Sequence, residues 1–71
     1  MKRVDLLRLI AGAAQRSGRE WRLLRDVGDH EVWSFEGIRI VVPRPRELNE
    51  MTALRVLVKL EERLGTRWWL R

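Results

Sequence analysis

The sequence contains no cysteine, and its 71 residues include a single histidine, His30. Without cysteine, the chain forms no disulfide, offers no thiolate nucleophile and lacks the thiolate ligands of common zinc sites. Histidine is the side chain that most readily exchanges a proton near neutral pH. If this protein performs acid–base chemistry, we therefore expect His30 to be its catalytic residue, and we expect no metal and no other cofactor.

Long apolar runs are also missing from the sequence. After Lys2 and Arg3, the first apolar stretch is interrupted by Asp5 and Arg8, which is unlike the apolar core of a signal peptide. No run approaches the roughly 20 apolar residues that a helix needs to span a bilayer. We expect a soluble, cytoplasmic protein that does not act at a membrane.

Basic residues are in clear excess. The chain has 15 lysines and arginines against 10 acidic residues, which gives a net charge of +5 and a pI near 11.3. All but two of the basic residues are arginine, whose planar fork of N–H donors suits phosphate groups. Codon usage in GC-rich genomes also favours arginine, so the positive net charge is the stronger indicator. Such a charge is typical of a nucleic-acid-binding domain.

The length predicts one small domain that spans residues 1–71. A domain of this size buries only about 60% of the surface that its unfolded chain exposes, so its core is thin. Four tryptophans, one phenylalanine and many aliphatic residues bring the hydrophobic content to 45%, which is too high for a disordered chain. Packing, or a partner protein, must provide the stability that disulfides or metals give to other small domains.

Two segments have the apolar spacing of amphipathic helices, residues 4–17 and 50–64. Gly18 and Gly65 are placed to end them, and Asn49 is placed to cap the start of the second helix. The first helix is expected to have a broad apolar face made of Val4, Leu6, Leu7, Leu9, Ile10, Ala11, Ala13 and Ala14. The second is expected to bury Ala53, Val56, Leu57, Leu60 and Leu64.

Between the helices, three segments have the alternation of β-strands: residues 20–27, 30–36 and 38–42. The turns Gly28-Asp29 and Glu36-Gly37 join them into an antiparallel meander. The chain is thus predicted to have an α+β fold of order α-β-β-β-α, with two helices on one face of a three-stranded antiparallel sheet. Residues 66–71 form a tail without a clear period.

His30 is expected to open the second strand, where a side chain can be exposed and still be held by the strand behind it. RNA suits a histidine that works without a metal, because the 2′-hydroxyl of the RNA is itself the nucleophile. The base takes the hydroxyl proton while cations stabilise the charge that develops at phosphorus. The nearest candidate cations in the sequence are Arg22, Arg25, Arg39, Arg44 and Arg46. The competing interpretation is an ordinary surface histidine in a turn.

Two further features have a functional and a structural interpretation each. In the Pro-Arg alternation of residues 43–46, the prolines would keep Arg44 and Arg46 apart, so that each arginine contacts one of two successive phosphates of a nucleic acid. Alternatively, this segment simply ends the sheet. Trp68 and Trp69 would stack on bases or seat a partner, or they pack over the thin core.

Three ordered motifs resemble the HicA family of bacterial toxins. They are Gly28-Asp29-His30-Glu31-Val32-Trp33, then Glu36-Gly37, then the segment of residues 42–53, which reads Val-Pro-Arg-Pro-Arg-Glu-Leu-Asn-Glu-Met-Thr-Ala. The family has a Gly-x-His turn that opens the second strand, a Val-Pro exit rich in arginine or histidine from the third, and a Thr-Ala start to the last helix. The resemblance covers the chain from the first helix through Gly65.

The resemblance implies a fold like that of double-stranded-RNA-binding domains. It also implies an endoribonuclease, an mRNA interferase of a type II toxin–antitoxin system, which a HicB-like antitoxin neutralises. The catalytic histidine of the family falls on His30, and the turn glycine falls on Gly28. One departure is Pro45, where relatives often have a histidine, which puts RNA binding or proton transfer by that position in doubt. Another is the start of the first strand, which here reads Gly-Arg-Glu-Trp over residues 18–21.

Two other functions remain open from the sequence. The first is a non-catalytic RNA-binding module on the same scaffold, which would need basic residues but no histidine chemistry. The second is a protein-interaction subunit whose thin core a partner completes through the tryptophan-bearing tail.

Overall fold

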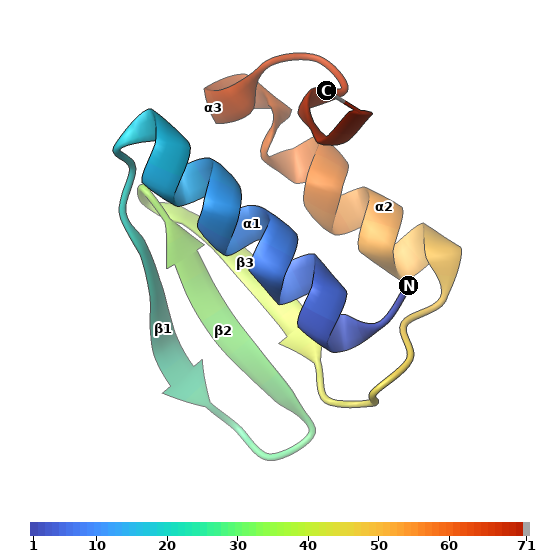
Figure 1. Cartoon of the computed structure of the whole chain (residues 1–71). Helices are drawn as coiled ribbons and strands as arrows, with labels where there is room; N and C mark the ends of the chain where they lie inside the picture. Colours follow the sequence, from blue (N-terminus) through green and yellow to red (C-terminus); the bar gives the residue numbers. More distant parts are fainter. Residues whose placement is uncertain (71) are drawn as a thin grey trace.

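The computed structural model describes residues 1–70 and has the predicted α+β order of elements. The elements are α1 (Arg3–Ser17), β1 (Trp21–Asp26), β2 (His30–Phe35), β3 (Ile38–Pro43), α2 (Glu50–Lys59), α3 (Glu61–Leu64) and the 3-10 helix η1 (Trp68–Leu70). The strands form one antiparallel sheet in the order β1-β2-β3 (Figure 1). Within residues 1–70, no helix combines the length and the apolar character that a membrane crossing requires.

The two faces of the sheet differ, because successive side chains of a strand point to opposite sides. Phe35, Ile40 and Val42 point to the inner face and are almost completely buried. In Figure 1, α1 lies across this inner face and α2 lies beside α1, close to β3. Buried residues from both helices, four of α1 and two of α2, form one cluster with those of the inner face, which confirms the predicted arrangement. That cluster contains Leu6, Ile10, Ala13, Ala14, Phe35, Ile40, Val42, Leu48, Val56, Leu57, Leu60 and Trp68.

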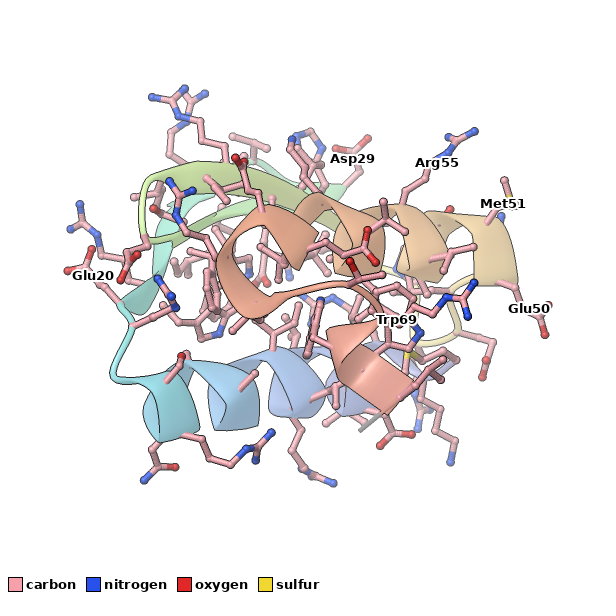
Figure 2. The ribbon with its side chains drawn as sticks, turned by 90° about the horizontal axis from the view of Figure 1, so that it is seen from above. Glu20, Asp29, Glu50, Met51, Arg55 and Trp69 are labelled. Atoms are coloured by element: carbon pink, nitrogen blue, oxygen red, sulfur yellow. The ribbon has the colours of Figure 1, made fainter. Side chains whose placement is uncertain are left out.

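The other side of the sheet, here called the open face, carries no helix in the described part of the chain (Figure 2). Residues that pair across antiparallel strands share a face, so the register identifies its members. Ser34 pairs with Arg22 on one side and Arg39 on the other, while Val32 pairs with Arg25 and Val41. His30 pairs with Pro43 at the end of the sheet. The open face therefore consists of Arg22, Arg25, His30, Val32, Ser34, Arg39, Val41 and Pro43.

Helix α1 begins at Arg3 and ends where predicted, with Gly18 in the left-handed conformation at φ 67°. Its buried face is narrower than the sequence predicts. Val4 is 52% exposed and Ala11 is also exposed, so the expectation that both are buried was wrong. The residues of α1 that the core buries are Leu6, Ile10, Ala13 and Ala14. A single helix lying on a small sheet has contact along one stripe only, which explains the difference.

The predicted helix over residues 50–64 is divided in the structure. Asn49 caps its start as predicted, because its side-chain oxygen accepts a hydrogen bond of 2.8 Å from the Thr52 N–H. The helix is interrupted at Leu60, which has φ −88° and ψ 0° and is fully buried. Its N–H donates to the carbonyl of Leu57, the pattern of a tightened last turn. The interruption lets α3 leave the axis of α2 while Leu60 stays in the core.

The sequence predicted a tail without regular structure over residues 66–71, and the structure corrects this for residues 66–70. Arg71 lies outside the described residues. Residues Trp68–Leu70 form η1, and Trp68 is only 7% exposed. The indole Nε1 of Trp68 donates a hydrogen bond of 2.8 Å to the Leu57 carbonyl. Trp69 lies edge-on to Trp68, with ring centroids 6.0 Å apart. The tryptophan at position 68 is therefore a core residue, as one of the two interpretations predicted.

The hydrogen bond of Trp68 gives a stability prediction. The variant Trp68→Phe removes the indole N–H and with it one of the two hydrogen bonds that the Leu57 carbonyl accepts, which costs roughly 0.5–1.5 kcal/mol. The other bond, from the Leu60 N–H, remains. Trp69→Phe is the matched control, because no hydrogen bond of its indole is seen in residues 1–70. Urea unfolding followed by circular dichroism measures both. Equal losses in the two variants would contradict the role given to Trp68.

Candidate functional site

His30 is the first residue of β2 and follows a tight turn. The turn is closed by a hydrogen bond of 3.1 Å from the Val27 N–H to the His30 carbonyl. Gly28 occupies this turn at φ 86°, a conformation that glycine adopts without strain. The backbone of His30 is thus fixed on one side by the turn and on the other by its pairing with Pro43.

The imidazole of His30 is oriented by its neighbour Asp29. Its Nδ1 lies 2.8 Å from Oδ1 of Asp29, and the His30 side chain is 38% exposed. Because a carboxylate can only accept, Nδ1 carries the hydrogen in this pair, and the neutral ring then has its lone pair on Nε2. Figure 2 shows Asp29 pointing away from α1, on the side of the open face. The ring nitrogen suited to accept a proton is therefore Nε2.

Glu31, the next residue, points to the opposite side of the sheet. Its side chain is only 15% exposed and forms an ion pair with Arg3 at the start of α1. The same carboxylate accepts a hydrogen bond of 3.1 Å from the indole of Trp33, and Arg44 lies 3.9 Å away. These contacts fix Glu31 on the helix side, and strand alternation then turns His30 outward. Neither Glu31 nor Arg3 was expected from the sequence to contribute to the site.

Three of the five predicted arginines share the open face with His30. Arg25 lies opposite Val32, two positions along β2 from His30. Arg22 and Arg39 flank Ser34, about 13 Å from His30 at roughly 3.3 Å per residue. In the described chain, Arg25 and Arg39 form no ion pair, while Arg22 lies 3.5 Å from Glu20. The open face thus presents largely uncompensated positive charge along β1 and β3.

The other two predicted arginines lie elsewhere. Arg44 forms an ion pair with Asp26, and its backbone N–H donates to the Asp29 carbonyl at 3.1 Å. Arg46 lies two residues further along, beside Lys2 at the start of α1. Pro45 separates them. The structure therefore does not bring Arg44 and Arg46 onto the open face.

Two cations that the sequence analysis missed extend the open face. Arg55 and Lys59 of α2 line a groove of about 210 Å³ together with Val41 and Thr52. Figure 2 shows Arg55 pointing to the same side as Asp29. Neither cation has an acidic partner among residues 1–70. Their signal in the sequence is the spacing of residues 52, 55 and 59, which places all three on one side of a helix.

The open face combines a proton acceptor with donors for phosphate oxygens. Nε2 of His30 is the proton acceptor, and the unpaired arginines are the donors for phosphate oxygens. Residues 1–70 contain no group of three or more histidine, aspartate or glutamate side chains that could hold a metal ion. Comparison of the chain with protein-family models, with curated proteins and with solved structures found no match.

The ion pair next to the site changes how Asp26 titrates. The hydrogen bond from the Arg44 guanidinium lowers the pKa of Asp26 below its ordinary value of 3.8, and the N–H of Gly28 adds to the effect. The same contact raises the pKa of Arg44. Because the folded-state pKa of Asp26 is the lower one, the pair stabilises the fold above the ordinary carboxyl pKa. This contribution is lost as the pH falls through the lowered pKa.

The variant Arg44→Gln is expected to return the pKa of Asp26 towards 3.8, because the charged donor is lost. Carboxyl ¹³C chemical shifts recorded as a function of pH measure the change. Arg46→Gln is the control and should leave Asp26 unchanged, since Arg46 makes no contact with it. An Asp26 pKa that is the same with and without the Arg44 guanidinium would contradict the assignment.

Proposed function

We propose that this protein is a metal-independent endoribonuclease that cleaves messenger RNA in the cytoplasm, acting as the toxin of a type II toxin–antitoxin pair. One observation carries the proposal. His30, oriented through Nδ1 by Asp29, lies on a face of the sheet that no described helix covers and that also carries the unpaired Arg25 and Arg39. The reacting group and the phosphate-binding groups thus lie on one accessible surface.

In the proposed step, Nε2 of His30 removes the proton from a 2′-hydroxyl of the RNA. The 2′-oxygen forms a bond to the adjacent phosphorus, and the bond from phosphorus to the 5′-oxygen of the next nucleotide breaks. The imidazolium then returns a proton to that departing oxygen, so one histidine serves as base and then as acid. The fragments end in a 2′,3′-cyclic phosphate and a 5′-hydroxyl. No metal is required, because the RNA provides its own nucleophile.

The cations of the open face would hold the RNA strand and stabilise the transition state. Arg25 is the arginine of this face nearest to His30 in register, and its guanidinium is the candidate for the charge that develops at the reacting phosphate. Arg22, Arg39, Arg55 and Lys59 lie further away and would hold phosphates along the strand. Val32 and Val41, which lie between the cations, offer apolar contact to bases.

The resemblance to the HicA toxins adds a protein partner to the proposal, a HicB-like antitoxin. An antitoxin must prevent RNA from reaching His30, and the open face is the surface it would have to cover or distort. Its binding would therefore suppress cleavage and compete with RNA.

The catalytic role is tested with the variant His30→Ala and a messenger RNA substrate in EDTA. The parent protein is expected to cleave, and the variant is expected to lose at least about 100-fold of the rate, because the general base is missing. Arg16→Ala is the control, since Arg16 lies on α1, on the other side of the sheet from His30. Circular dichroism checks that each variant is folded.

Cleavage by His30→Ala at the parent rate would overturn the catalytic assignment. RNA binding by the parent protein without any cleavage would favour the non-catalytic RNA-binding module instead.

RNA binding by the open face is tested by its salt dependence. For single-stranded RNA, each phosphate contact contributes about 0.7 to the slope of log K against log salt concentration. Arg25→Ala and Arg39→Ala are each expected to weaken binding and to reduce the slope by about this amount. Arg16→Ala should leave the slope as it is. Slopes that change equally for all three variants would contradict a defined RNA path over this face.

A further inference from the structure

A second basic site lies away from the open face, between the start of α1 and the chain that leaves β3. It is a cavity of about 600 Å³, a volume within the usual range of small-molecule sites. Its lining residues are Lys2, Arg3, Val4, Arg44, Arg46 and Glu47. Four of these six side chains are cations.

The walls of this cavity are fixed by hydrogen bonds between its two segments. The backbone N–H of Arg3 donates to the Arg46 carbonyl at 2.8 Å, and Lys2 pairs with Glu47 as an isolated antiparallel bridge. The guanidinium of Arg3 also donates from Nε to the Pro43 carbonyl at 2.9 Å. The site is therefore preformed, so a ligand need not order it.

The charges of the cavity are only partly compensated. Arg3 and Arg44 are each engaged by a carboxylate, from Glu31 and Asp26 respectively. These pairs hold the guanidinium groups in place, and a guanidinium has five N–H donors, so each keeps donors for a further anion. Glu47, the one acidic lining residue, lies 2.9 Å from the α-amino group of Met1.

Lys2 and Arg46 complete the site, and their charges are free. Neither forms an ion pair within residues 1–70, so two full positive charges line one cavity without a counter-charge. A phosphate monoester carries a charge of about −1.5 to −2 near pH 7 and has several acceptor oxygens. It thus matches both the free charge and the arginine donors of this cavity.

We infer that this cavity binds a phosphate group, carried either by a nucleic-acid strand or by a small phosphate ester such as a nucleotide. The site is separate from His30, which points to the other side of the sheet. It does not depend on the proposed RNA cleavage, although the backbone N–H of Arg44 links it to the Asp29 carbonyl beside the imidazole. Arg44 and Arg46, expected from the sequence to contact phosphates, would then do so here and not on the open face.

The test is a titration of the ¹⁵N-labelled protein with three probes, followed by amide chemical shifts. The probes are inorganic phosphate, adenosine monophosphate and a short single-stranded RNA. Saturable shifts at Lys2, Arg46 and Glu47 are expected with at least one probe. Shifts with the first two identify a site for small phosphate esters, and shifts with RNA alone identify a backbone-phosphate site.

A matched pair of double variants localises the effect. Lys2→Gln with Arg46→Gln should weaken binding of the active probe at these amides by about tenfold or more, because both free charges are removed. With inorganic phosphate or adenosine monophosphate as the probe, Arg25→Gln with Arg39→Gln should leave it unchanged. For RNA, which the open face is also proposed to bind, the control is Arg16→Gln. All four side chains are exposed and unpaired in the described chain, so neither variant removes a packing contact.

The inference fails if no probe shifts these amides, or if both double variants weaken binding equally. Such a failure would leave RNA cleavage by His30 unaffected, and loss of the His30 role would leave phosphate binding here unaffected.

Discussion

The carboxylate of Glu31 determines how the start of β2 is presented. A largely buried carboxylate is costly unless it is paired, and Glu31 is paired with Arg3 from α1 and hydrogen-bonded to the indole of Trp33. This contact joins the first helix to the central strand and fixes which side of β2 faces the core. His30 is the preceding residue, so strand alternation directs it to solvent. The proposed active site thus depends on a contact formed on the opposite side of the sheet.

Charge is distributed unequally over the molecule. On the helix side and at the ends of the sheet, carboxylates hold arginines in place, as in the contacts of Arg3 with Glu31, Arg44 with Asp26 and Arg19 with Glu36. On the open face and along α2, four cations lack such partners among residues 1–70: Arg25, Arg39, Arg55 and Lys59. Paired arginines give the small domain a rigid frame. Unpaired ones leave a positive field, which in the proposed function would draw an anionic strand towards His30. Arginine therefore stabilises the fold on the helix side of the sheet and is proposed to bind RNA on the open face.

Local patterns predicted the parts of this fold that depend on local physics. Alternation and the two turns correctly predicted three antiparallel strands, and the αL position of Gly18 and the cap of Asn49 followed from residue type. The interruption at Leu60 and the burial of Trp68 depend on contacts that only the folded chain creates. The same holds for the site: His30 was found because it is the only histidine, whereas Glu31 and Arg55 acquire their positions through other elements. The separation of Arg44 from His30 likewise arises from its ion pair with Asp26, 18 residues earlier in the chain.

The proposed function requires RNA to lie on the open face, against His30. An NMR titration with an RNA strand whose 2′-hydroxyls are replaced by hydrogen, so that it binds but cannot react, tests this most directly. We expect the ring signals of His30 and the amides of Arg25, Val32 and Arg39 to shift together and to saturate at one concentration. Shifts confined to the solvent side of α1, with the His30 ring signals unchanged, would contradict the proposed function.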